Sequence, residues 1–271
     1  MHGHEVHREQ LRSAFNGMAA TYDHEFESLE ATKRIRSVTT DIFLRYFKPG
    51  SSLLELNCGT GTDAIMLARR GFRILATDVS PAMIHEVQKK VARYGLQERI
   101  SAQVLPFEEL SALKGQVFDG IYSNMGGLNC THDLGRLASE LHSLVKTGGH
   151  LIASVMTGFS LWETMSFLVR GNVRKAFRRL SRDAVTANLH GEPVQIYYYP
   201  PRTVAQSCSP YFSAVEIKGL NIFTPPPASQ NAYRVLGNAS HLLEKLDDGV
   251  AGMYPFNRIG DHYCIVLKAL R

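Results

Sequence analysis

Residues 53–62 read Leu53-Leu54-Glu55-Leu56-Asn57-Cys58-Gly59-Thr60-Gly61-Thr62, and the rest of the chain is organised around them. A short apolar run, a glycine-rich turn and the start of a helix follow one another here, as in an open α/β sheet. Glycines at such a turn let the backbone approach a ligand closely and leave N–H groups free at the start of the helix. Because ligands of open α/β sheets bind at the carboxyl ends of the strands, this turn predicts a binding site.

Strand and helix patterns alternate from this turn to residue 156. The expected strands are 52–56, 73–77, 100–105, 118–123 and 150–156, and the expected helices between them are 62–70, 81–94 and 134–145. This alternation is typical of a doubly wound parallel sheet with right-handed crossovers. Strand character returns near 194–199, 214–223 and 262–270. Helical spacing marks 11–47 and 229–247, and 162–182 has the pattern of one or two helices.

Asp78 ends the second expected strand and is a second expected part of the ligand site, beside the glycine-rich turn. A carboxylate at this position accepts hydrogen bonds from the ribose hydroxyls of an adenosine ligand, either NAD or S-adenosylmethionine (SAM). Ala64 satisfies the looser GxGxxA form of the dinucleotide pattern. Glu55, however, has no evident use in a dinucleotide site, so an NAD-type oxidoreductase remains the less favoured alternative.

Several segments resemble the motifs of one family, and they occur in that family's order. Residues 55–61 resemble the ExGxGxG motif of class I SAM-dependent methyltransferases, and 78–83, 118–121 and 144–151 resemble the family's second motif, fourth-strand signature and L-K-P-G-G-x-L element. Residues 15–23 are similar to the F-x-x-x-A-x-x-Y-D opening of the ubiquinone/menaquinone-biosynthesis type. The matches together are much more specific than any one of them.

The resemblance implies a fold, a cofactor and an activity. The implied fold is a doubly wound, seven-stranded mixed sheet of the Rossmann-like methyltransferase type, with its last strand antiparallel, N-terminal helices and a substrate-cap insert. The implied activity is methyl transfer from SAM to a small-molecule or lipid-like acceptor by in-line displacement. The implied divisions are 1–47 for a tail and cofactor-covering helices, 48–156 for the SAM-binding core, 157–210 for the cap, and 211–271 for the C-terminal strands with a helical insert at 225–260.

By this resemblance, the cofactor site combines residues from the N-terminal helices and the strand ends. The turn is shaped by Asn57, Cys58, Gly59 and Gly61, and it is ordered by Glu55. Asp78 binds the ribose hydroxyls, and the adenine lies between Val79 and Met83. The sulfonium side is faced by Ser123 and Asn124, and Tyr22 covers the cofactor. Asn57 replaces the family's first glycine, but asparagine is the non-glycine residue that best tolerates positive φ. Gln103 stands near the place of an aspartate that meets the adenine amino group. These departures leave a catalytically silent SAM-binding protein as an alternative.

The acceptor side offers candidates for a general base, which methyl transfer needs only when the acceptor is protonated and weakly acidic. Asp261 and His262 begin the last expected strand, whose start meets the carboxyl ends of the others if it runs antiparallel as in the family. His132 begins a helix near the same edge and is a second candidate. A structural hydrogen bond is the alternative role for His262. Residues 123–130 lack the N/D-P-P-Y/F motif of base-modifying enzymes, which argues against a nucleic-acid methyltransferase.

The positive charge of the chain is concentrated in one segment. The net charge is +5, yet 170–182 alone holds Arg170, Arg174, Lys175, Arg178, Arg179 and Arg182 with no acidic residue. Helical spacing would place Arg174, Arg178 and Arg182 on one face. We interpret this face as a lid over an anionic or amphiphilic substrate, or as a peripheral contact with a membrane, and a solvated amphipathic helix is the plain alternative.

Other features describe the setting of the protein. The four cysteines lie far apart with no CxxC pair, which argues against zinc and against a disulfide scaffold. No apolar run approaches the ~18 residues of a membrane span, and the N-terminus lacks the apolar core of a signal peptide. We therefore expect a cytoplasmic protein without a metal site, and we expect residues 1–10, with His2, His4 and His7, to form a polar tail. The sequence does not set the oligomeric state.

Overall fold

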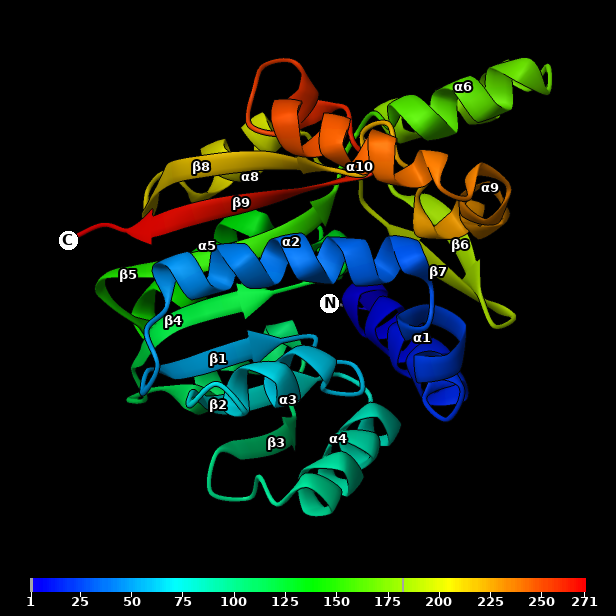
Figure 1. The fold of residues 1–271 in the computed structure, drawn as a ribbon. Helices are drawn as coiled ribbons and strands as arrows, with labels where there is room; N and C mark the ends of the chain where they lie inside the picture. The colour runs from blue at the N-terminus through cyan, green and yellow to red at the C-terminus, as the bar shows by residue number, and fades with distance from the viewer. Residues whose placement is uncertain (1, 182) are drawn as a thin grey trace.

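A seven-stranded sheet forms the centre of the molecule (Figure 1). The computed structural model describes residues 2–181 and 183–271. The sheet has the order β3-β2-β1-β4-β5-β9-β8. Its strands are β1 (Ser52–Leu56), β2 (Arg73–Asp78), β3 (Ile100–Val104), β4 (Phe118–Ser123), β5 (Val145–Met156), β8 (Phe212–Leu220) and β9 (His262–Ala269). β9 runs antiparallel to both β5 and β8, and the other neighbouring pairs are parallel. The predicted doubly wound sheet with an antiparallel last strand is confirmed.

Helices cover both faces of this sheet and bury two apolar clusters. One face packs against α2 (Glu30–Tyr46), α3 (Thr62–Ala68) and α4 (Pro81–Tyr94), and the other against α5 (Leu134–Leu144), α8 (Pro201–Cys208) and the helical turn Phe107–Leu113. Local sequence sets the bounds of α4: Ser80 accepts a hydrogen bond from Met83 N and Pro81 takes the first position, while Gly95 ends the helix at φ 66°.

The N-terminal residues form a helix, so the expectation of a polar tail over 1–10 is wrong for the described residues. α1 (His2–Met18) buries Leu11 and Ala14 against Val194 and Ile196 of the insert. His7 Nε2 lies 2.8 Å from the carbonyl oxygen of Cys130. These long-range contacts order a segment whose own composition is polar, and the side chains of His2 and His4 lie outside those described. A π-helical turn, Asp23–Glu27, separates α1 from α2 and divides the continuous helical pattern predicted over 11–47.

The insert is a short helical projection followed by a hairpin. α6 (Leu161–Val169) and α7 (Val173–Ala176) are separate helices, and β6 (Val185–Leu189) pairs antiparallel with β7 (Glu192–Ile196). The predicted arginine face is wrong for Arg174 and Arg178, because α7 ends at Ala176 and Arg178 begins a separate 3-10 turn, Arg178–Leu180. Arg178 instead turns toward Glu163 with an Nε–Oε1 distance of 2.8 Å, and Arg182 lies outside the described residues.

Two further helices complete the chain before the last strand. The helical pattern predicted over 229–247 corresponds to α9 (Gln230–Leu236) and α10 (Ala239–Val250), which are divided at Gly237 and extend three residues beyond the prediction. No helix in the described part of the chain is long and apolar enough to cross a bilayer.

Candidate functional site

The glycine-rich turn between β1 and α3 holds three residues at positive φ. Asn57, Gly59 and Gly61 have φ values of 48°, 53° and 79°. A Cβ atom at Gly61 would lie 3.0 Å from both methyl carbons of Val87 on α4, so this glycine also permits close packing of two helices. The turn forms as the sequence predicts, with asparagine in the left-handed region that the family fills with glycine.

The Asn57 side chain joins the end of β1 to the end of β4. Its Nδ2 donates to the carbonyl oxygen of Asn124 at 2.9 Å, and its Oδ1 accepts from Ser123 Oγ at 2.6 Å. The side chain fills the space beside Gly127, where a Cβ atom would lie 1.9–2.2 Å from the Asn57 amide. Two predicted site residues, Ser123 and Asn124, are therefore brought together with Asn57.

Asp78 ends β2 and holds the same turn from the other side. Its Oδ2 accepts from Gly59 N and its Oδ1 from Ser80 N, each at 2.9 Å. Burial raises the pKa of Asp78 to about 6, although the backbone N–H groups of Ser80 and Gly59 act in the opposite direction. A carboxylate held in this way keeps further lone pairs for hydroxyl donors.

Arg36 and Asp63 belong to a buried charged cluster that the sequence interpretation did not find. Arg36 of α2 pairs with Glu27, its Nε 2.6 Å from Oε2, and also with Asp63. Asn124 Nδ2 donates to Asp63 Oδ2 at 3.0 Å. Burial, and next the charge of Asp63, raise the pKa of Glu55 well above its ordinary value. Only the long-range fold brings these residues together, so no local pattern could reveal the cluster.

This cluster tests whether the site fits the implied cofactor. Glu55 Oε2 and Asp63 Oδ1 are buried and have no hydrogen-bond partner in the described chain. Buried carboxylate oxygens are costly without a donor. A ligand with a protonated amino group would supply donors at Glu55 and Asp63, and hydroxyl groups would supply them at Asp78. SAM carries both, so the residues present fit it.

The N-terminal segment covers the turn. The Tyr22 ring lies 3.8 Å from the Cβ position of Gly59 and stacks on Phe26 at 5.1 Å between centroids. Tyr22 and Met83 share one apolar cluster, whereas Val79 packs in another with Phe15.

The remaining predicted cofactor residues lie around the same strands. Cys58 is buried, and burial raises the pKa of its thiol well above the ordinary value. Gln103 faces Thr77 across β3 and β2, one position before the pair Val104 and Asp78.

Asp261 and His262 lie at the start of β9, beside the end of β5. His262 Nδ1 is 2.8 Å from Asp261 Oδ2, and Arg179 Nη2 is 2.7 Å from Asp261 Oδ1. Burial opposes ionisation of Asp261, but the guanidinium of Arg179 and then His262 outweigh it and hold the pKa of Asp261 below its ordinary value. The ionised Asp261 side chain therefore joins Arg179 of the insert to His262 at the start of β9. His132 lies elsewhere, with its ring 6.0 Å from that of Tyr197.

Asn129 and Cys130 connect the strand ends to the insert. Asn129 Nδ2 donates to the carbonyl oxygens of Met156 and Tyr197, at 3.0 and 2.6 Å. Burial raises the pKa of Cys130 to about 12, so its thiol stays protonated at neutral pH. These contacts give both residues a structural role.

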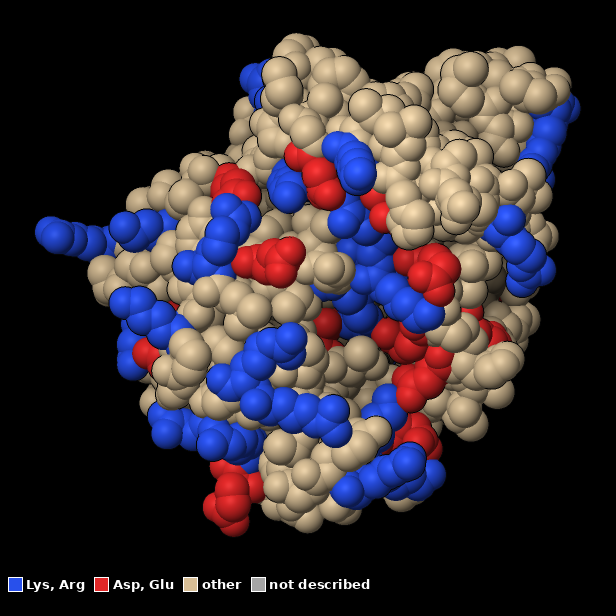
Figure 2. Space-filling view, viewed as in Figure 1, with Lys and Arg blue, Asp and Glu red and all other residues tan. Residues whose placement is uncertain are grey.

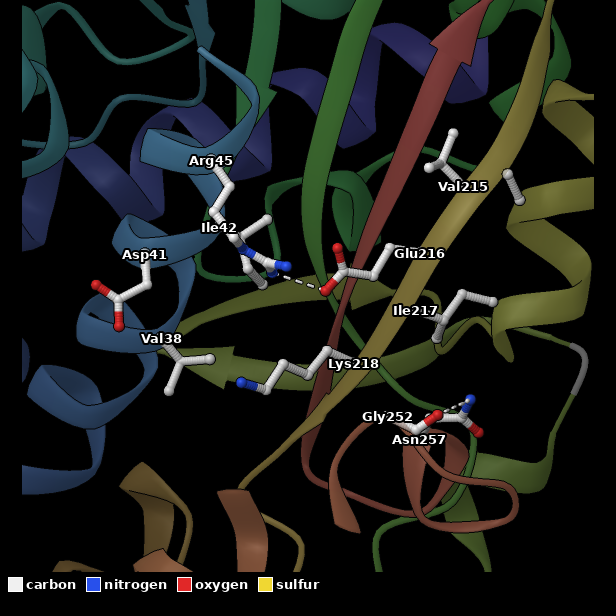
Figure 3. Close-up of a pocket in the computed structure, with 11 residues that line it drawn as sticks. Val38, Asp41, Ile42, Arg45, Val215, Glu216, Ile217, Lys218, Gly252 and Asn257 are labelled. Carbon is white, nitrogen blue, oxygen red and sulfur yellow. Dashed lines mark hydrogen bonds and ion pairs between the residues drawn. The ribbon is translucent and has the colours of Figure 1, made fainter. Parts of the chain in front are cut away.

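A groove of about 740 Å³ lies away from this site, between α2 and β8 (Figure 3). Arg45 and Glu216 point toward each other across it, 2.7 Å apart, and Tyr46 also donates to Glu216. The groove shares no lining residue with the glycine turn, so it is not the cofactor site.

Comparison with known proteins gives a methyltransferase domain and similar relatives. Residues 53–149 match the family described as "Methyltransferase domain". The demethylmenaquinone methyltransferase of Bacteroides fragilis is 29% identical over 155 residues, which cover 55% of this chain and 61% of the relative. That of Symbiobacterium thermophilum is 25% identical over 194 residues, covering 65% and 74%. The chain thus spans less than two thirds of the first of these relatives.

Solved structures agree on the fold. The CcbJ methyltransferase from Streptomyces caelestis superposes with a TM-score of 0.60 at 13% identity, covering 94% of this chain and 96% of that one. The domain match, the collinear motifs and the sheet order agree: residues 53–149 form a methyltransferase domain, and the chain is similar to class I SAM-dependent methyltransferases of the ubiquinone/menaquinone-biosynthesis type.

Proposed function

We propose that the protein transfers a methyl group from SAM to a small-molecule or lipid-like acceptor. The observation that carries this proposal is the position of Asp78, whose carboxylate lies at the end of β2 and binds Gly59 N of the glycine turn. The same edge holds orphaned carboxylate oxygens of Glu55 and Asp63. These groups match the ribose and amino groups of one ligand, and the domain match over residues 53–149 agrees with them.

The chain's own residues would bind, orient and enclose the reactants. A bound SAM supplies an electrophilic methyl group on a sulfonium. Asp78 fixes the ribose side, Glu55 and Asp63 fix the amino side, and Tyr22 and Met83 exclude water from the glycine turn. Such positioning accounts for much of the rate of an in-line displacement. Gln103 is assigned to the adenine edge by its place beside Asp78.

We assign the acceptor to the space beneath the insert. The relatives' names give demethylmenaquinone as their acceptor, which favours a lipid-like or amphiphilic molecule here. The insert adds aromatic surface, because Tyr197 and Tyr199 stack with an interplanar angle of 8°. Arg179 lies 4.8 Å from the centre of the Tyr198 ring, but its charge is used by Glu163 and Asp261. An anionic acceptor would therefore meet the exposed cations of 170–175 first.

His262 is our proposed general base for an acidic acceptor. Asp261 lies against its Nδ1 and would orient the ring, as a carboxylate does in catalytic dyads. Methyl transfer by a His262→Gln variant should be slower and should depend differently on pH, while SAM affinity stays unchanged. A variant with unchanged rate and pH profile would move the assignment to His132 or remove the need for a base.

The proposed setting is the cytoplasm. The four cysteines are free thiols, which persist in a reducing compartment. For residues 170–182 we propose a peripheral contact with the surface of a bilayer, which does not require a segment that spans it.

Calorimetric titration with SAM and with its demethylated product, S-adenosylhomocysteine, tests the function. The wild type should bind both, and Asp78→Asn should weaken binding at least about tenfold, because a hydrogen bond to a charged group contributes about 1.5–3 kcal/mol. Asp119→Asn is the matched control, since Asp119 lies at the opposite end of the parallel strands and pairs with Lys146. Binding of NAD instead of SAM, or equal affinity in both variants, would contradict the proposal.

A further inference from the structure

The helical projection of residues 161–180 leaves large apolar side chains exposed. We name this segment the α6–α7 projection. Val169 and Val173 are 84% and 60% exposed, and the other exposed apolar residues of the segment are Met165, Leu168, Phe177 and Leu180. α6 stands out from the body of the molecule at the upper right of Figure 1. In the matching space-filling view, this part of the surface is mostly uncharged and carries Lys and Arg at its outer end (Figure 2).

The base of the projection is firmly attached, so the exposure is a property of the fold. Arg179 is buried, with Nη2 2.6 Å from Glu163 Oε2 and 2.7 Å from Asp261 Oδ1. Thr164 Oγ1 donates to the carbonyl oxygen of Ala176 at 3.1 Å and joins α6 to α7. These buried contacts orient the two helices and hold Val169 and Val173 outward.

Cations surround the exposed apolar side chains. Arg170, Arg174 and Lys175 are exposed, and none of the three forms an ion pair with another described residue. No aspartate or glutamate occurs from residue 164 to residue 181. A protruding apolar tip with unpaired cations is the combination that binds the interface of an anionic bilayer, where apolar groups enter the acyl boundary and cations meet lipid phosphates.

We propose that the α6–α7 projection docks the protein on an anionic lipid surface, with Val169 and Val173 inserted. The projection follows directly from the end of β5, at the same edge of the sheet as the glycine turn. Docking would therefore hold that edge near the bilayer. This surface binding needs no cofactor, although its use in delivering an amphiphilic acceptor rests on the proposed function.

Vesicle co-sedimentation of the full chain tests the docking. The wild type should sediment with vesicles of phosphatidylcholine and phosphatidylglycerol, and much less with phosphatidylcholine alone. The Val169→Glu, Val173→Glu variant should lose more than about tenfold in partitioning, because burying a valine contributes about 1.5 kcal/mol or more. Reversal of Arg170, Arg174 and Lys175 to Glu should lose at least about a hundredfold at low salt, since each cation near the surface contributes about 1 kcal/mol.

Val117→Glu is the matched control. Val117 is 52% exposed and precedes β4 at the amino ends of the parallel strands, away from the projection. It should partition like the wild type, and unchanged circular dichroism would show that all variants are folded. Equal loss in the control, or a wild type that binds neither vesicle, would overturn the docking. Light scattering that reveals a dimer broken by the valine substitutions would assign the projection to a second copy of the chain instead. If the wild type and the variants partition onto vesicles as expected but the wild type does not bind SAM, the docking stands and the proposed function is refuted.

Discussion

Asp78 is charged at neutral pH in spite of its burial. Burial raises the pKa of this carboxyl to about 6, and the backbone N–H groups of Ser80, Gly59 and Val79 act against that rise. The unfolded chain has an aspartate pKa of about 3.9. The folded state therefore binds the proton more readily, and the contribution of Asp78 to stability falls as the pH rises between about 4 and 6.

Cofactor affinity should follow the opposite trend. The ionised carboxylate accepts ribose hydroxyls better than the neutral acid, so the affinity for S-adenosylhomocysteine should increase as pH rises through about 6 and level off above about 7. Titration calorimetry at constant ionic strength measures this. Asp78→Asn should give weak binding without that step, and a wild type whose affinity is flat over the same range would refute the ribose assignment.

Single residues divide clearly into those that sequence could assign and those that it could not. The tolerance of Asn57 for positive φ and the position of Asp78 after a strand are local properties, and the structure places both at the glycine turn. Arg36 and Asp63 lie in helices whose local sequence carries no sign of a charged cluster. The packing of α2 on α3 brings the two side chains together. Asn16 is similar, since its Oδ1 accepts from Ser80 Oγ at 2.7 Å across α1 and α4.

Among the elements, α2 carries two arginines in contrasting ion pairs. Arg36 lies between Glu27 and Asp63 in a largely buried cluster, whereas Arg45 pairs with Glu216 at a side-chain exposure of 54%. Removing one partner of a buried pair costs about 3–5 kcal/mol, while an exposed pair contributes about 0–1 kcal/mol. We expect Arg36→Met to lower the free energy of unfolding by about 3 kcal/mol or more and Arg45→Met by less than about 1 kcal/mol.

Urea denaturation followed by circular dichroism compares the two variants on the same helix. Similar urea midpoints for Arg36→Met and Arg45→Met would contradict the expectation. They would mean that solvent screens the Arg36 cluster and that Glu27 and Asp63 do not need this cation for stability. Arg36→Lys distinguishes charge from geometry, because lysine keeps the charge but not the bidentate fork toward Glu27.

Elements of the central sheet could be predicted because each has its own local signals. The pattern predicted a strand over 118–123, as found, and the Ser80-Pro81 start and Gly95 end predicted α4. The insert lacked such signals. The helical spacing of the arginines concealed the end of α7 at Ala176. β6 alternates half-buried with exposed residues, since its partner among the described strands is β7.

At the scale of the molecule, α1 and the β6–β7 hairpin form a joint cover over the carboxyl edge of the sheet. Ser13 Oγ donates to Glu192 Oε1 at 2.9 Å, and His190 Nε2 lies 2.9 Å from Glu25 Oε2. Hydrophobic contacts between α1 and β7 lie beneath these surface bonds. Tyr22, which follows α1, lies 3.8 Å from the Cβ position of Gly59, so we expect cofactor exchange to involve movement of this cover.

Binding of S-adenosylhomocysteine should therefore slow amide hydrogen exchange in α1 and in the β6–β7 hairpin. With the proposed function, a ligand held by Tyr22 and Met83 would favour the closed arrangement, and stabilisation grows with ligand concentration above the dissociation constant. Mass spectrometry of peptides from these segments measures the change. α10 packs elsewhere and serves as the internal reference, and uniform slowing of all peptides would indicate global stabilisation without closure of the cover.

The contact between Asn57 and Gly127 couples substitutions at the two positions. An alanine at 127 would place its Cβ within 2.2 Å of the Asn57 amide, so a larger residue at 127 requires the Asn57 side chain to move or to be replaced by a smaller one. Replacing Asn57 by glycine would remove this clash, but it would also remove the bonds between the turn and β4. The effects of Asn57→Gly and Gly127→Ala on stability should therefore not add, and the double variant should lose less than the sum of the two single losses.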